Sequence, residues 1–154
     1  MTMTDNASDQ ASQFLDKQPR IVFERVNEAL GNYSDKDWNY SRISLAIRPL
    51  GNVDGPYALN LEVLDLTTKQ GRNDLNALVD EVKWGERHSS ELGILEVVSL
   101  RINKALLEVT SDEYWQQARP VVRIVKKETI AGQHATHALW YQVTEVAGEE
   151  FDNR

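Results

Sequence analysis

The spacing of the apolar residues changes abruptly at Trp84-Gly85, and this change constrains the fold more than any other feature of the chain. Before it, Leu78, Val82 and Trp84 are two or four residues apart, which is the spacing of a strand. After it, residues 94–106 carry apolar side chains at intervals of three and four, which is the spacing of a helix. The sequence therefore predicts a strand that leads directly into an amphipathic helix.

The other apolar patterns divide the chain into short elements separated by turn residues. They predict a helix at 19–31, a strand at 42–48, a loop at 49–56, a hairpin of strands 57–66 and 74–84, a short helical turn at 113–118, and a second hairpin of strands 121–130 and 137–146. Ser89 and Ser90 are candidate N-caps of the helix between the hairpins. This order indicates the α+β class, with a single antiparallel sheet of about five strands and helices packed on one face.

The length of 154 residues is typical of one domain, which we place at 19–146. Residues 1–18 are polar and lack the apolar stretch of a signal peptide, so we expect a flexible arm there and a flexible acidic tail at 147–154. No apolar run approaches the roughly 20 residues that cross a bilayer. We therefore expect a protein without a membrane partner.

Composition argues against several kinds of chemistry. The chain has no cysteine, which excludes disulfides, thiolate zinc sites and cysteine nucleophiles. A net charge of -7 disfavours direct nucleic-acid binding, because that binding depends on Lys and Arg neutralising phosphates. The sequence contains neither a glycine-rich phosphate loop nor a GxSxG nucleophile motif. We expect a non-enzymatic protein with no cofactor.

The three histidines are the remaining candidates for catalysis or metal binding. His134 and His137 are three residues apart and would lie on opposite faces of a strand, although Glu128 could join them across the predicted hairpin. We favour ordinary turn residues over a metal site there. A small hydrolase that uses His88 or His134 with nearby carboxylates is a third-ranked alternative for the function.

Charged and aromatic residues suggest where the protein contacts others. The basic cluster at 119–127 fits a solvated edge strand or a contact with the acidic residues 149–152 of another copy. Loops at 49–56, 67–73 and 131–134 are candidate contact loops, and two tryptophans lie in polar surroundings. The predicted interface residues are Trp38, Asn52, Asp54, Lys69, Arg72, Trp115, Arg123 and Lys127.

The segments VKWG, INKALL, RIVKKE and HALWYQV follow one another in an order that resembles the tail terminator, or tail completion, proteins of tailed bacteriophages. The resemblance covers 19–146, while the arm before Pro19 and the predicted turn at 113–118 depart from it. It implies a structural protein of the virion, assembled in the host cytoplasm. Such proteins form a hexameric ring that ends the tail tube and joins it to the neck, so the implied partners are copies of this chain, tube proteins and neck or connector proteins.

A small acidic binding protein, such as an immunity protein or a secretion chaperone, is the alternative from another class. Its acidic surface would neutralise a basic partner, which the net charge of -7 allows. Assembly separates the two hypotheses, because a tail terminator should form rings and an inhibitor should form a one-to-one complex.

Overall fold

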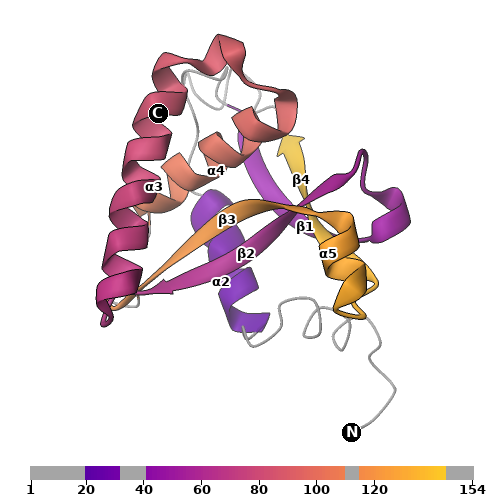
Figure 1. Ribbon diagram of the computed structural model, residues 1–154, viewed down its shortest axis with the longest axis horizontal. Helices are drawn as coiled ribbons and strands as arrows, with labels where there is room; N and C mark the ends of the chain where they lie inside the picture. Colours follow the sequence, from indigo (N-terminus) through magenta and orange to yellow (C-terminus); the bar gives the residue numbers. More distant parts are fainter. Residues whose placement is uncertain (1–19, 32–40, 110–114, 145–154) are drawn as a thin grey trace, which may run out of the picture.

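The computed structural model describes residues 20–31, 41–109 and 115–144 (Figure 1). The elements, in chain order, are α2 (Arg20–Gly31), β1 (Arg42–Pro49), the 3-10 turn η2 (Leu50–Asn52), β2 (Tyr57–Asp65), α3 (Lys69–Arg87), the 3-10 turn η3 (Ser89–Glu91), α4 (Ile94–Val109), β3 (Ala118–Lys126), α5 (Lys127–Gly132) and β4 (His137–Thr144). The predicted arm at 1–18, the predicted tail at 147–154 and Trp38 lie outside the described residues.

The four strands form one antiparallel sheet in the order β1-β4-β2-β3, and the helices pack against it. This arrangement confirms the α+β class, with four strands in place of the expected five. In the register, Leu45 of β1 lies opposite Tyr141 of β4, and Leu61 of β2 lies opposite Val122 of β3. β1 and β3 are therefore the edge strands.

The predicted strand at 74–84 is wrong, because this segment belongs to the long helix α3. Thr68 caps the helix, with its side-chain oxygen accepting a hydrogen bond from the Gly71 N–H at 3.0 Å. Leu78 and Val82 are buried on one face of α3. Their separation of four residues fits a strand and also nearly one helical turn, so the spacing alone could not distinguish the two. Most of the candidate contact loop at 67–73 is accordingly the first part of this helix.

The second predicted hairpin is also wrong. β3 ends at Lys126, and the residues expected to continue it form α5 instead. β4 then crosses to pair with β1, and β2 lies between β3 and β4 in the sheet. The helix at 19–31 and the strands at 42–48 and 57–66 are confirmed as α2, β1 and β2.

The second long helix, α4, begins later than the serine caps predict. Ser89 and Ser90 form part of η3, and Ile94 is the first residue of α4. The start of α4 is held by Glu96, whose Oε1 accepts a hydrogen bond from the Gly93 N–H at 3.1 Å. Of the predicted turn at 113–118, residues 113 and 114 lie outside the described residues, and Ala118 already belongs to β3.

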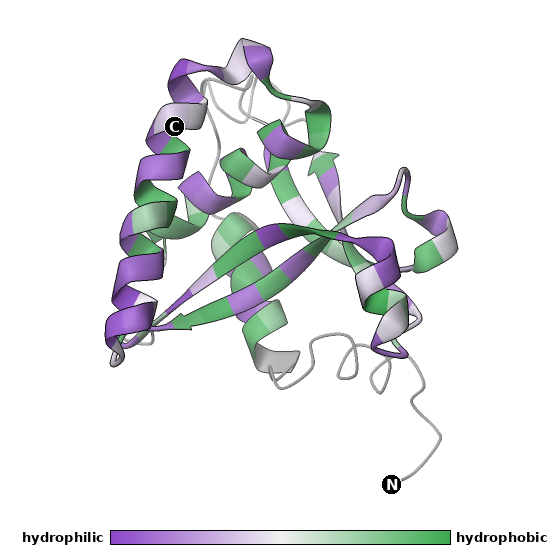
Figure 2. Cartoon of the chain, viewed as in Figure 1, coloured by the Kyte–Doolittle hydropathy of each residue, from purple (hydrophilic) through white to green (hydrophobic). Residues whose placement is uncertain are grey.

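Two apolar clusters hold the layers together. The main cluster joins α2 and α4 to the strands, and Leu59, Ile102 and Leu139 are fully buried in it. A smaller cluster of Leu64, Leu78 and Val121 attaches α3 to β2 and β3. Figure 2 shows α3 as largely hydrophilic, with apolar residues at intervals, which is the pattern of a helix that packs along one stripe.

Asparagine side chains from two helices bind the main chain of the two edge strands. Asn27 of α2 binds both the N–H and the C=O of Leu45 in β1, each at 2.8 Å. Asn103 of α4 binds both main-chain groups of Val122 in β3. Such bonds make the middle of each edge unavailable for pairing with another strand. Within the described ranges, no helix combines the length and the apolar character needed to span a membrane.

Candidate functional site

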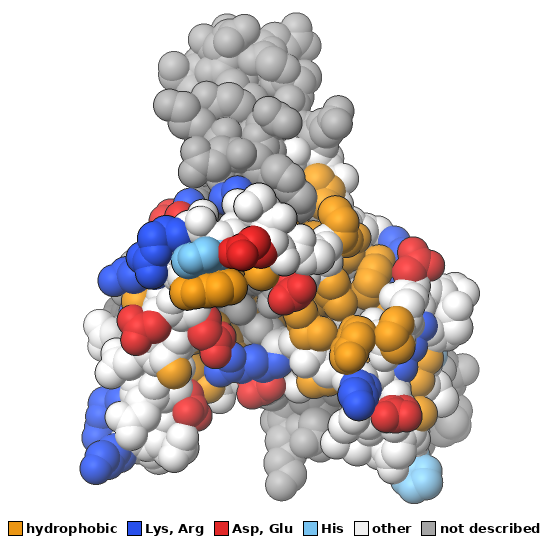
Figure 3. All heavy atoms as spheres, turned by 45° about the horizontal axis from the view of Figure 1, so that its top comes forward, with side chains coloured by type: hydrophobic (Ala, Val, Ile, Leu, Met, Phe, Trp, Pro, Cys, Tyr) orange, Lys and Arg blue, Asp and Glu red, His pale blue; other side chains and the backbone are white. Residues whose placement is uncertain are grey.

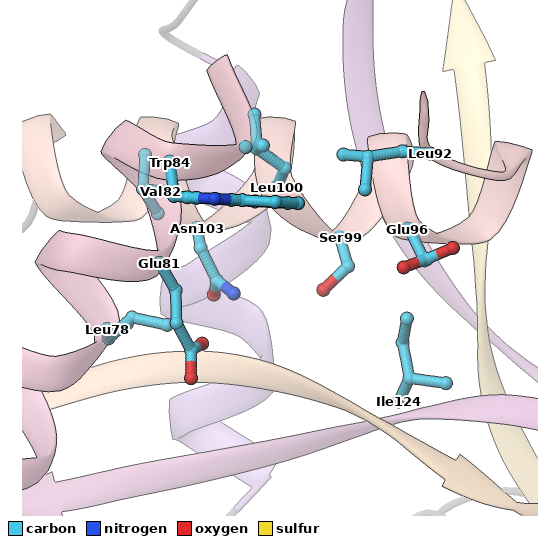
Figure 4. Close-up of a pocket in the computed structure, with 11 residues that line it drawn as sticks. Leu78, Glu81, Val82, Trp84, Leu92, Glu96, Ser99, Leu100, Asn103 and Ile124 are labelled. Carbon is cyan, nitrogen blue, oxygen red and sulfur yellow. The ribbon is translucent and has the colours of Figure 1, made fainter. Parts of the chain in front are cut away.

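A groove lies between α3, α4 and the outer edge of β3 (Figure 4). Its cavity volume is 210 Å³. Its lining is mainly apolar, with two carboxylates and two neutral polar side chains, and consists of Leu78, Glu81, Val82, Trp84, Gly85, Leu92, Glu96, Ser99, Leu100, Asn103 and Ile124. All of these residues come from the three elements named or from the short connection between α3 and α4.

Gly85 explains why the two helices approach closely beside the groove. A Cβ atom at this position would lie 2.1 Å from Cδ1 of Leu100 on α4, well inside van der Waals contact. Only glycine leaves room for Leu100 in this arrangement. The Trp84-Gly85 pair therefore marks the contact between two helices, with Gly85 facing α4 and Trp84 left largely exposed.

Two polar side chains lie between the walls of the groove. Figure 4 shows Ser99 and Asn103 between Trp84 above and Ile124 below. Asn103 is 5% exposed, and its amide is occupied by Val122. Ser99 is also buried, and its hydroxyl points into the groove. Ser99 thus supplies a hydroxyl that can hydrogen-bond an occupant.

The charges that line the groove are both negative. Glu81 of α3 forms an ion pair with Arg123 of β3, with Oε2 and Nη1 separated by 3.5 Å. Glu96 of α4 accepts its hydrogen bond from Gly93. No lysine or arginine is among the described residues that line the groove. Because the Glu81 side chain is 66% exposed, its carboxylate can accept a second cation beside Arg123, so the groove favours an occupant that is apolar in its middle and positively charged at its ends.

Two of the hydrophobic side chains that line the groove are exposed. They are Trp84, at 48%, and Ile124, at 36%. Figure 3 shows hydrophobic side chains gathered on both sides of a hollow on this face of the molecule. Soluble proteins rarely expose contiguous apolar surface unless it binds something. We call the groove, with the exposed side chains of Trp84 and Ile124, the apolar face.

The three histidines lie apart from one another, and each has its own local surroundings. The ring of His88 stacks on Trp84 at a centroid distance of 4.3 Å, and its Nδ1 lies 2.8 Å from the Trp84 carbonyl oxygen. Nδ1 of His137 lies 2.8 Å from the hydroxyl of Thr136. His134 is exposed and has a φ of 64°, in the turn after α5. In the part of the chain that the structure describes, no three histidine or carboxylate side chains are placed to hold a metal ion.

The predicted interface residues do not line the groove. Asn52 and Asp54 are exposed near η2, and Lys69 and Arg72 are exposed in the first turn of α3. Lys127 begins α5, and its Nζ donates a hydrogen bond to the carbonyl oxygen of Val53.

Of the remaining predicted residues, one pairs with a lining residue and another lies in the core. Arg123 does not line the groove, but it forms an ion pair with Glu81, which does. Trp115, expected at an interface, is 4% exposed and belongs to the main apolar cluster.

Sequence reasoning missed the exposed residues of the apolar face. The predicted strand places Trp84 on the same side as Leu78 and Val82. In the helix, Trp84 lies away from the side that carries these two buried residues. The helical spacing of Leu75, Leu78, Val82 and Gly85 places Trp84 off the buried stripe and is the signal that could have shown it.

Comparisons with models of known families, with curated proteins and with solved structures found no match.

Proposed function

We propose that the protein is a non-enzymatic structural subunit of a tailed phage, which forms a ring that ends the tail tube and joins it to the neck. The apolar face carries this proposal. A subunit of an assembly needs a surface that contacts neighbouring proteins, which in a tail include tube and neck proteins as well as copies of the subunit, and the exposed side chains of Trp84 and Ile124 give this chain such a surface. The order of its sequence segments, which resembles the tail terminators, supplies the type of assembly.

The asparagine hydrogen bonds at the two sheet edges also support an assembly of defined geometry. Because Asn27 and Asn103 occupy the main chain of Leu45 and Val122, strand pairing between copies cannot run through the middle of either edge strand. Open-ended strand addition would give fibres, whereas contacts between side-chain surfaces can close into a ring. The described fold is thus suited to closed assembly.

The first experiment is the solution mass of the purified chain by light scattering, with negative-stain images of the same fraction. The chain has a mass of 17.5 kDa, and the proposal expects a species of six times this mass with ring-shaped particles. The measurement should cover micromolar to near-millimolar concentrations, because weak ring contacts require mass action. A monomer or dimer throughout that range would overturn the ring.

A second function is favoured by the two carboxylates in the groove. Glu81 and Glu96 beside an apolar hollow suit a small acidic protein that neutralises a basic partner. This function predicts a one-to-one complex with that partner and no ring. The same light-scattering measurement, repeated with the partner present, distinguishes it from the tail terminator.

A further inference from the structure

We propose that the groove binds an extended segment of a different, basic protein, with one large apolar side chain between Trp84 and Ile124 and a lysine or arginine beside each of Glu81 and Glu96. This inference goes beyond the ring, since it defines the chemistry of a partner and holds whether or not copies of the chain assemble. Three properties of the groove support it: its size, the main chain at its edge, and its charge.

The size of the groove suits one anchoring side chain. Its volume of 210 Å³ is below the range of roughly 300 to 1,000 Å³ that holds cofactors and drug-sized ligands. A single buried anchor surrounded by other contacts is the usual centre of a protein interface. The walls formed by Val82, Leu92 and Leu100 present apolar surface to such an anchor.

The edge of β3 offers main-chain hydrogen bonds beside this anchor site. The N–H and C=O of Val122 both bind Asn103, so they point away from β2. In an antiparallel ladder the same groups two residues on, those of Ile124, point the same way. Among the described residues, no hydrogen bond from outside the sheet reaches the main chain of Ile124. An extended segment can therefore pair there while its side chain enters the groove.

The charge of the groove selects the partner. Glu81 and Glu96 belong to α3 and α4, on two sides of the hollow, and Figure 4 shows them apart on either side of Ser99. The whole chain carries a net charge of -7, so two copies repel each other at long range. Arg123 offsets part of the charge of Glu81, and the remaining negative charge of the groove and of the whole chain attracts a basic partner. Charge complementarity therefore favours a basic partner over a second copy of the chain.

The test uses a defined peptide, acetyl-Lys-Val-Leu-Val-Lys-amide, added to the full isotope-labelled chain and followed by NMR. We expect the largest shifts at the Trp84 indole N–H and at the amides of Ser99, Leu100 and Ile124. Replacing the central leucine with serine should weaken binding at least about tenfold, because the apolar anchor is lost. Replacing both lysines with glutamates should also weaken binding at least about tenfold, because like charges then meet.

Protein variants provide matched controls. The double variant Glu81→Gln, Glu96→Gln removes both groove charges and should weaken the lysine peptide by about threefold to tenfold. The double variant Glu91→Gln, Glu108→Gln removes the same net charge from exposed residues that do not line the groove, and should leave the affinity within about twofold. Thermal melts of both variants show whether the loss of the Glu96 cap affects folding.

Three results would overturn the inference: absence of shifts at Trp84 and Ile124 at millimolar peptide, equal affinity for the lysine and glutamate peptides, or equal effects of the two double variants. Shifts of the groove signals with the concentration of the protein alone would show that another copy occupies the groove, which would also overturn it. Light scattering decides the ring separately. A ring that does not bind the peptide would contradict this inference alone. A monomer that binds the peptide would contradict the ring alone.

Discussion

The side chain of Asn103, on α4, forms two hydrogen bonds with the main chain of Val122, on β3. Its Oδ1 accepts from the Val122 N–H at 2.8 Å, and its Nδ2 donates to the Val122 carbonyl oxygen at 3.0 Å. Both residues are buried, and buried main-chain groups are normally hydrogen-bonded because an unpaired one is costly. The amide stands where the main chain of another strand would pair, and it fixes α4 against the edge of the sheet that borders the groove.

Replacing Asn103 with alanine should lower the free energy of unfolding by about 2 to 4 kcal/mol, because two buried main-chain groups lose their partners. The same change at Asn27 should cost less, about 1 to 2 kcal/mol, since its bonds to Leu45 are only partly buried. Urea unfolding measures both values. Asn76→Ala, on the exposed side of α3, is the control and should stay within about 0.5 kcal/mol. A cost for Asn103→Ala no larger than the control would show that the bonds do not hold the edge.

Three glycine-to-alanine changes should differ in their effect on the free energy of unfolding, depending on which atoms lie near the new Cβ atom. At Gly71 it would lie 1.8 Å from the main-chain oxygen of Asp65, which cannot move without disturbing the start of α3, so we expect a loss above about 3 kcal/mol. At Gly85 it would meet side chains, chiefly Leu100, and the loss should be about 1 to 2 kcal/mol after the gain in helix propensity.

Gly132 is the control for this series, because nothing lies within 4 Å of its Cβ position. Gly132→Ala should be neutral or stabilise by up to about 1 kcal/mol. Chemical denaturation of the three variants gives the order directly. If Gly85→Ala proved as harmless as Gly132→Ala, the close approach of α3 and α4 at the groove would be wrong.

The sequence predicts those elements that have one buried side and one exposed side. In β1, Ile43 and Leu45 alternate with less buried residues, and the strand was predicted. In α3, Leu78 and Val82 fit two periods, and the assignment depended on Trp84, which is not on the buried side. The six residues of α5 are too few to show a period.

Strand order and the groove depend on contacts between segments far apart in the chain. The pairing of β4 with β1 joins residues about a hundred positions apart, and no local pattern specifies it. The groove likewise needs Gly85, Leu100 and Ile124 from three elements. A correct assignment of α3 would have shown that Trp84 is exposed, but not that Ile124 faces it.

The carboxylate of Asp65, just before α3, should titrate below its usual range. The Thr67 hydroxyl donates to Asp65 Oδ1 at 2.6 Å and the Thr67 N–H donates to the same atom at 3.0 Å, and these bonds hold the pKa of Asp65 low. Because the ionised form is favoured in the folded state, the stabilisation is present above the ordinary pKa. It is lost as the pH falls below about 4, through the lowered pKa.

Carbon-13 NMR titration of the Asp65 carboxyl measures this shift. Thr67→Val removes the hydroxyl donor and should raise the pKa of Asp65 part of the way back, since the N–H bond remains. Thr129→Val, on the exposed surface of α5, is the control and should leave the titration unchanged. A pKa of Asp65 that is the same in wild type and Thr67→Val would exclude the hydroxyl as the cause.

Two tryptophans should differ in how strongly their replacement by alanine lowers the free energy of unfolding. Trp115 is 4% exposed within the main apolar cluster, so Trp115→Ala should cost about 3 to 5 kcal/mol. Trp84 is 48% exposed and its ring stacks on His88, so Trp84→Ala should cost less than about 1 kcal/mol. Denaturation measures the costs, and acrylamide quenching of fluorescence should fall in Trp84→Ala, because an accessible indole is removed. Comparable costs at the two positions would mean that Trp84 is buried in solution, with the apolar face already covered.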